Sequence, residues 1–327
     1  MGYVAGELIK DDEYNAFVAS SSSPFGYNHI AGTGSGNQGL GQTELAQVSA
    51  SDSNQIKAAS WNSLLAAIDN LANHTNDTMT TRGQVTAGDP IKIKANLATD
   101  LATLSASVAG GCTGATDGLT ESSELRSAAA SGRFAGSHVV EHSVTFASGN
   151  NLRFFFNAGG KIRIKLTRTG NGGSSAKTSK DDSVDELITA MGNFDIGAQV
   201  STRSGSGESL QTDGLDKGVD DFGTSYQTIA VIRQSSGTYT TMDLKFEGKV
   251  DNATYGSAVK VTIKCSVIDA DSGDSQFTSG NTSGVDQFAN FIGVTDFALH
   301  TVNPNTDDGL GSVVGISDSA IESNTTS

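Results

Sequence analysis

One stretch constrains the fold of this chain more than any other: residues 152–168, which read LRFFFNAGGKIRIKLTR. It holds two apolar runs joined by Asn157–Gly160, and paired glycines accept the positive φ angles that tight turns need. In residues 161–166 apolar and basic side chains alternate strictly, which indicates a strand with one dry and one wet face. Phe154–Phe156 is apolar throughout, so a strand here would be covered on both sides or lie at a subunit contact. We therefore predict a β-hairpin at the centre of a β-sandwich.

Other downstream segments carry the same kind of strand pattern. In 242–250 and 258–269, apolar residues alternate with charged or hydroxyl-bearing residues along the whole run. Half-buried antiparallel strands that are separated by turns indicate a sandwich or a barrel. Besides the hairpin, the predicted strands are 139–146, 194–200, 224–233, 242–250, 258–269 and a last one at 297–302.

A helix is expected among these strands. Ser183–Glu186 forms a capping box, an apolar stripe follows at helical spacing, and Gly192 ends it. The chain has 39 glycines and many Ser, Thr, Asn and Asp residues, which suits strands joined by turns and argues against an all-helical protein. The expected fold class is mainly β, with a C-terminal antiparallel β-sandwich preceded by an N-terminal module of short helices and extended arms.

The expected domain organisation has four parts. An N-terminal docking module of helices and arms spans 1–110, a polar linker spans 111–135, and the β-sandwich domain spans 136–302. A polar C-terminal tail at 303–327 is expected to extend away from the sandwich, either disordered or laid on a neighbour.

The N-terminal module contains an internal repeat. The pattern of Ile9–Phe17 (IK, three residues, then YNAF) recurs 47 positions later in Ile56–Leu64 (IK, three residues, then WNSL). Each copy predicts the start of a helix in which the aromatic residue packs inward. A weaker third copy at 93–97 leads into another helix, which is expected to end at Gly110–Gly111.

The helix of the second copy carries five large apolar residues on one stripe. The module offers too little chain to bury its stripes, so we expect it to dock on another subunit, with its Gly/Ser-rich arms ordering on assembly. The candidate assembly contacts are Ile9, Tyr14, Phe17, Ile56, Trp61, Leu64, Leu65, Ile68 and Leu71.

The net charge of −15 limits the partners of this chain. An acidic surface repels phosphate backbones, so no nucleic acid is expected. The dense basic run at 153–180 overlaps the wet face of the predicted hairpin; a solvated sheet face accounts for it, and an anion-facing contact stays open. Charged residues at 10–13 precede any apolar run, which indicates no signal peptide, and no stretch approaches membrane-spanning length. We expect a soluble protein made in a cytoplasm, with no membrane insertion.

Two motifs resemble functional signatures. His138–His142 reads H-x-x-E-H, a zinc-binding pattern when it lies on a helix. β-Branched residues dominate this run and predict a strand, on which the two histidines share one face and Glu141 occupies the other, so zinc chemistry is not expected. Gly34–Gly39 matches G-x-G-x-x-G, but it neither follows a strand nor opens a helix, so no dinucleotide site is predicted.

Acidic residues raise two further hypotheses. Asp269, Asp271 and Asp274 resemble a calcium loop without its distal glutamate, and an Asp-rich turn or a weak Ca²⁺ site both stay open. The pair Asp220-Asp221 could serve glycoside hydrolysis only at a carboxylate separation that sequence does not reveal. The two cysteines, Cys112 and Cys265, lie far apart and indicate no disulfide framework. We predict no catalytic residue, no cofactor and no metal ligand.

The segments GLGQTELAQVSASDSNQIKAASWNSLLAAIDNLANHT and VTFASGNNLRFFFNAGGKIRIKLTRTG resemble a family of virion proteins of tailed bacteriophages that infect cyanobacteria and other aquatic bacteria. The resemblance is strongest at 56–74 and 144–168 and extends loosely through 224–234 and 267–271. The family often has a Trp where this chain has Asp185–Leu187. The resemblance implies a structural role in the particle and transfers no catalytic residues.

We therefore expect a non-enzymatic structural component of a bacteriophage virion, in the tail, baseplate, neck or fibre. Expected partners are other virion proteins and copies of itself, and a host surface glycan is a further candidate. The alternative is a carbohydrate-binding host-recognition adhesin, a tail fibre or spike, that uses the loops at 201–223 and 270–296. A tail-associated hydrolase is a third hypothesis.

Overall fold

The computed structural model of this chain describes residues 11–21, 25–48, 56–86, 96–112, 119–130, 136–169, 179–235, 241–269, 294–304, 310 and 315–327. The chain divides into two compact units, and each is discontinuous in sequence. The first unit comprises Met1–Thr120, Gly149–Gly160 and Asn303–Gly315, and the second comprises Glu121–Ser148, Lys161–Val302 and Ile316–Ser327. The N-terminal module therefore gains two segments from later in the chain.

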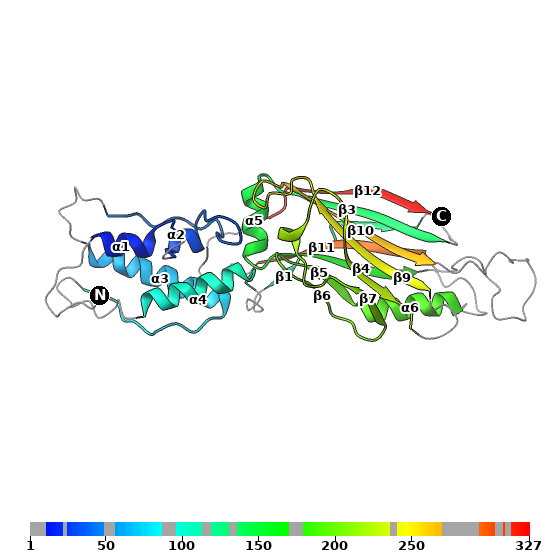
Figure 1. Ribbon diagram of the computed structural model, residues 1–327, viewed down its shortest axis with the longest axis horizontal. Helices are drawn as coiled ribbons and strands as arrows, with labels where there is room; N and C mark the ends of the chain where they lie inside the picture. Colours follow the sequence, from blue (N-terminus) through cyan, green and yellow to red (C-terminus); the bar gives the residue numbers. More distant parts are fainter. Residues whose placement is uncertain are drawn as a thin grey trace, which may run out of the picture. The chain divides into compact units, whose positions relative to one another are not determined.

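The first unit is helical (Figure 1). Helices at both repeat copies, and at the third, were predicted and are confirmed as α1, α3 and α4, and α4 ends at Gly110 as expected. Ile9 and residues 93–95 lie outside the described residues. The helices are α1 (Asp11–Val18), α2 (Tyr27–Ile30), α3 (Ala58–Thr75), α4 (Leu97–Ala109) and α5 (Gly149–Asn157).

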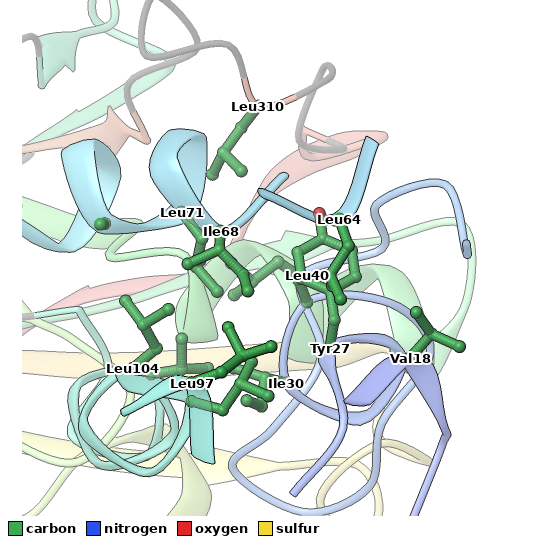
Figure 2. Close-up of a cluster of buried hydrophobic side chains, with 14 of the residues drawn as sticks. Val18, Tyr27, Ile30, Leu40, Leu64, Ile68, Leu71, Leu97, Leu104 and Leu310 are labelled. Atoms are coloured by element: carbon green, nitrogen blue, oxygen red, sulfur yellow. The ribbon is translucent and has the colours of Figure 1, made fainter. Parts of the chain in front are cut away.

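The two repeat copies pack on each other through their equivalent aromatic residues. The ring centroids of Tyr14 and Trp61 lie 5.4 Å apart in an edge-to-face arrangement, and the Tyr14 hydroxyl donates to the Ser60 carbonyl at 3.4 Å. Both rings belong to an apolar cluster to which Leu40 and Leu310 contribute from outside the helices. Figure 2 shows part of this cluster, including Leu40 and Leu310. Burial of each large apolar side chain stabilises the unit by roughly 1.5–3 kcal/mol.

The Asn that follows each aromatic residue of the repeat makes a matching pair of backbone hydrogen bonds. Asn15 Nδ2 donates to the Val48 carbonyl and Asn15 Oδ1 accepts from the Val48 amide, both at 2.8 Å. Asn62 does the same with Val85, at 3.0 and 2.9 Å. Asn28, which follows Tyr27, pairs with Leu45 at 2.9 and 2.8 Å. Each side-chain amide therefore holds an extended segment against its helix, which the sequence pattern alone did not indicate.

Replacing Asn62 by Ala is expected to lower the free energy of unfolding of the first unit by about 2 kcal/mol, because two hydrogen bonds to the Val85 backbone disappear together. Urea unfolding followed by the emission of Trp61, the single tryptophan, measures this effect. Ser63→Ala is the control, since the exposed Ser63 hydroxyl bonds only the Ala59 carbonyl of its own helix. Equal midpoints for the two variants would contradict the prediction.

The predicted hairpin at 152–168 is wrong in its first half. Phe154–Phe156 lies in helix α5, and the hydrogen bonds of Gly159 and Gly160 to the carbonyls of Phe156 and Phe155, 3.0 and 2.9 Å long, close that helix. Gly159 has φ +92°, a value that ends a helix as readily as it turns a hairpin. A short apolar run is compatible with either element, and here tertiary packing overrides the β preference of phenylalanine.

The second unit contains two antiparallel sheets. The first sheet has the order β1-β11-β4-β5-β6, with β2 also pairing β11, and the second sheet has the order β12-β3-β10-β9-β8-β7 (Figure 1). The strands are β1 (Thr120–Glu121), β2 (Arg126–Ala129), β3 (Ser137–Thr145), β4 (Lys161–Thr169), β5 (Asn193–Ile196), β6 (Ser201–Arg203), β7 (Ser209–Asp213), β8 (Gln227–Arg233), β9 (Met242–Val250), β10 (Lys260–Asp269), β11 (Val294–Asn303) and β12 (Asp318–Thr326).

The two sheets pack face to face. The rings of Phe194 on β5 and Phe246 on β9 stack with centroids 4.0 Å apart, and the rings of His138 on β3 and Phe297 on β11 lie 5.4 Å apart. The expected fold class, a strand-rich C-terminal part with antiparallel sheets after N-terminal helices, is confirmed. The alternation in β4 is confirmed as well: Ile162, Ile164 and Leu166 are buried, while the basic face pairs with carboxylates, such as Arg163 with Asp195 at 2.6 Å.

Two expectations about the second unit need correction. The segment predicted as a linker, 111–135, contains β1 and β2, and the predicted polar tail contains β12, which pairs with β3 along its length. Polar residues form strands here because β1, β2 and β12 occupy edge positions with one solvated face. The predicted helix after Ser183 is confirmed as α6 (Ser179–Met191), although it begins four residues earlier. The short helix η1 (Val219–Asp221) precedes β8.

Candidate functional site

The structure places the predicted assembly contacts inside the first unit. The buried ones are Tyr14, Trp61, Leu64, Leu65, Ile68 and Leu71, and the partly buried ones are Phe17 and Ile56. Trp61, for example, is only 2% exposed. The expectation that the α3 stripe waits for another subunit is therefore wrong. That expectation assumed that the N-terminal module is too short to bury its apolar stripes. The cluster also contains residues of α2, Leu40 and Leu310 from the same chain, which complete the burial.

The glycine-rich loop at 34–39 has a structural role that its motif did not indicate. Arg153 of α5 is 3% exposed, and its guanidinium donates to the carbonyls of Thr33, at 2.6 Å, and Gln38. Asn157 Nδ2 donates to the Gly39 carbonyl at 3.1 Å. Positive φ angles at Gly34, Gly36 and Gly39 turn these carbonyls toward one another. The loop is thus a cradle for a buried cation, and as predicted it neither follows a strand nor opens a helix.

The H-x-x-E-H run lies on β3, as expected. His138 and His142 are fully buried between the sheets, whereas Glu141 faces the other side of the strand. His138 Nε2 donates to Asn324 Oδ1 at 3.1 Å, and His142 Nε2 donates to the Phe297 carbonyl at 3.1 Å. The two histidines therefore connect three strands, β3, β11 and β12, and the glutamate cannot act beside them.

Burial lowers the pKa of both histidines, since the charged ring would lose its hydration. The pKa of His142 falls to about 4, and its Nδ1 is buried with no hydrogen-bond partner among the described residues. Protonation would place an unsatisfied N–H donor there. The pair is consequently held neutral at ordinary pH.

Within the described ranges, no cluster of three or more His, Cys, Asp and Glu side chains could hold a metal ion. Asp271 and Asp274 of the calcium hypothesis lie outside those ranges, as do Phe277 and residues 270–293 of the adhesin hypothesis. In the other adhesin loop, Phe222 is 2% exposed and packs on Gly248, so it offers no aromatic platform. Asp221 Oδ2 accepts from the Gly218 amide at 3.1 Å and stabilises the start of η1.

A polar pocket on the outer face of the second sheet is the best candidate for a site. Its cavity has a volume of about 290 Å³. The register of the sheet brings its walls together, because Thr262 of β10 pairs with Lys249 of β9 on one side and with Ser143 of β3 on the other. The lining residues are Glu141, Thr224, Lys249, Val250, Asp251, Lys260, Thr262 and Glu322.

Several of the charged groups in and beside the pocket already have partners. Lys260 Nζ lies 2.6 Å from Glu322 Oε1, and Asp251 Oδ1 accepts from the Lys260 amide at 3.0 Å. Hydrogen bonds from Lys260 and Ser143 hold the pKa of Glu322 below its usual value. Burial raises the pKa of Glu247 nearby, but hydrogen bonds from its two lysine neighbours outweigh burial and lower it. These charged side chains are therefore already held in place by their hydrogen bonds and ion pairs.

Other pocket groups have no such partner. Lys249 and Glu141 form no ion pair, and the Thr224 and Thr262 hydroxyls form no hydrogen bond, with any described residue. Tyr226 lies beside them: the ammonium groups of Lys249 and Lys264 lie 4.1 and 4.2 Å from its ring centroid. Burial, and then the adjacent Glu141 carboxylate, raise the pKa of Tyr226. Its hydroxyl is buried and lies beside the Glu141 carboxylate.

The sequence did not reveal this pocket, because its residues come from four strands and from the loop before β8. The wet-face alternation of β9 and β10 was visible, but which strands lie beside them was not. None of the helices in the described parts of the chain is both long and apolar enough to cross a membrane. Comparisons of the chain with protein-family models, with curated proteins and with solved structures found no match.

Proposed function

We propose that this chain is a non-enzymatic structural component of a tailed-bacteriophage particle, located in its tail, baseplate, neck or fibre. The proposal starts from the resemblance of residues 39–75 and 144–170 to virion proteins of such phages. A protein of this kind is a building part, so its partners are other virion proteins and further copies of itself.

Support comes from the place where the resembling segments meet. Near the end of α3, His74 Nε2 donates to the Ala158 carbonyl, which follows α5, at 3.0 Å. The loop at 38–42 is tied to the same helix through Asn157 and its hydrogen bond to Gly39. Residues 39–75 and 149–160, more than 70 positions apart in sequence, thus share the first unit, whereas 144–148 and 161–170 belong to the second. The resembling segments therefore include residues that hold the first unit together, as a shared structural part would.

Contacts with other virion proteins are assigned to surfaces other than the α3 stripe, since the core of the first unit already buries that stripe. Light scattering on the purified chain tests whether copies associate without other proteins. A multiple of the 33.5 kDa chain mass is expected if self-assembly is part of the role.

The proposal is tested on particles of a phage that encodes this chain. Gradient-purified virions are digested and their peptides quantified against the major capsid protein by mass spectrometry. We expect peptides from both units at a constant ratio to capsid in every fraction that contains particles. Peptides that are abundant in the lysate but absent from the particles would reject the structural role.

A further inference from the structure

Two of the connections between the sheets pass through the first unit. β3 of the second sheet continues through α5 into β4 of the first sheet, and β11 of the first sheet continues through 303–315 into β12 of the second sheet. Residues 149–160, which contain α5, and residues 303–315 both belong to the first unit. We call these two segments the crossovers. Each crossover therefore lies in one unit and joins strands of the other.

The strand ends that the crossovers join are paired with one another. Thr145, at the end of β3, lies opposite Asp318 at the start of β12. Lys161, at the start of β4, lies opposite Val302 near the end of β11. His142 of β3 donates to a carbonyl of β11 at 3.1 Å, so the two strand pairs face each other near these ends. We call Thr145, Lys161, Val302 and Asp318 the crossover ends.

Hydrogen bonds hold the first crossover in the first unit. Arg153 and Asn157 of α5 donate to carbonyls of the loop at 33–39, and the Arg153 side chain is buried. Three residues separate α5 from β3 and three separate it from β4, and a chain of three residues reaches about 10 Å at most. In the first of these connections the Phe146 amide donates to the Val259 carbonyl at 2.8 Å, which restricts it further. α5 therefore cannot move far without moving the strand ends.

An apolar side chain holds the second crossover. Leu310 is 5% exposed and belongs to the apolar cluster of the first unit, together with residues of α3 and α4 (Figure 2). Leu310 lies between Val302 and Asp318 in sequence, so the segment that joins these two strand ends is fixed at this point. The two crossovers are thus anchored independently, one by hydrogen bonds and the other by apolar packing.

We propose that the first unit controls the opening of the crossover ends. Strand ends open more readily than strand centres, because their last hydrogen bonds have neighbours on one side only. An anchored crossover restricts the chain on both sides of it, so the open state gains little conformational freedom until the anchor is lost. A partner that loosened or tightened the core of the first unit would thus act on β3, β4, β11 and β12 without contacting them. The inference does not depend on a role in the virion.

Hydrogen exchange of the full chain at neutral pH, followed by mass spectrometry of its peptides, tests the proposal. We expect Arg153→Met and Leu310→Ala each to raise the exchange rate at the crossover ends roughly tenfold. Peptides from β8 and β9, which belong to the same unit but adjoin neither crossover, should keep the wild-type rate. Two anchors of different chemistry should therefore produce one pattern of exchange.

Leu65→Ala is the matched control for Leu310→Ala. Leu65 is 7% exposed and also belongs to the first unit, but it lies on α3, outside both crossovers. Its loss should leave the exchange of the crossover ends unchanged. Wild-type emission of Trp61 shows that the first unit of each variant is folded, and Leu310→Ala tests the proposal alone if Arg153→Met does not fold.

The inference fails on any of three results. One is wild-type exchange at the crossover ends in a folded Leu310→Ala variant. Another is that Leu65→Ala accelerates this exchange as much as Leu310→Ala, which would show that attachment to a crossover has no effect. The third is an even acceleration over the whole second unit, β8 and β9 included, because the substitutions would then destabilise that unit in general rather than release its strand ends.

Discussion

Replacing Arg153 by Met is expected to lower the free energy of unfolding of the first unit by about 4 kcal/mol, the largest effect of any substitution considered. The guanidinium is 3% exposed and satisfies the carbonyls of Thr33 and Gln38 at once. Methionine keeps most of the apolar volume but leaves the Thr33 carbonyl without this donor and the Gln38 carbonyl with only Asn157 Nδ2, at 3.2 Å. The lost hydrogen bonds are charge-assisted and are worth about 1.5–3 kcal/mol each. The loop at 33–39 would then lose its hydrogen bonds to residue 153 of α5.

Trp61 makes this measurement specific to the first unit, because it is the one tryptophan of the chain and lies in the core of that unit. Urea titration followed by its emission should show a midpoint well below that of the wild type. Arg233→Met is the matched control, since Arg233 is 40% exposed and its ion pair with Asp243 lies on the surface of the second unit. A midpoint for Arg153→Met no lower than that of the control would show that the cradle contributes little.

Acid is expected to destabilise the second unit by about 3 kcal/mol through His142. The folded-state pKa of this residue is about 4, against about 6.5 for an unfolded chain. Between those two values the unfolded chain binds a proton that the folded chain does not, so stability falls as the pH falls through this window. Above the window the penalty is absent, and below it the penalty no longer grows. The lowered pKa of His138 acts in the same direction.

Hydrogen exchange of peptides from β3 and β12, followed by mass spectrometry between neutral pH and pH 4, measures this loss. His142→Gln retains a donor for the Phe297 carbonyl but cannot titrate, so its protection should fall less on acidification than that of the wild type. Carboxylates contribute equally to both proteins and cancel in the comparison. His29→Gln, in the first unit, is the control and should leave the exchange of these strands unchanged. Parallel acid profiles for His142→Gln and the wild type would exclude the histidine as the cause.

The buried histidines also show how far sequence reasoning reached into the second unit. The β-branched run around them predicted a strand, and with it the opposite orientation of Glu141, because side chains alternate along any strand. Their partners Thr295, Phe297 and Asn324 come from β11 and β12, more than 150 residues later. No local pattern connects such distant segments, and β12 itself lay in a stretch that was interpreted as a tail.

The apolar stripe of α3 likewise separates what the sequence predicted from what it did not. Its period predicted a helix and an inward-facing Trp61, and both are confirmed. What covers the stripe was predicted incorrectly, because the covering residues come from the neighbouring repeat copy, a glycine-rich loop and Leu310. The hydrogen bonds by which Asn15 and Asn62 hold extended segments against these helices could not be predicted from the sequence either. A side-chain amide can bond to any backbone group that the tertiary structure brings near it.

The sequence by itself therefore determined the long periodic elements, α3, α4, β9 and β10, and the class of fold that they build. In a long segment, one face can be buried throughout only if the apolar residues repeat with the period of a helix or with that of a strand. The spacing of the apolar residues therefore identifies the backbone conformation. Only the tertiary structure decided that Phe154–Phe156 is a helix, that Arg153 is buried in a loop cradle, and that four strands enclose a polar pocket. These features depend on which distant segments of the chain come into contact. A short apolar run or a single charged residue is compatible with several tertiary environments, and packing selects one of them.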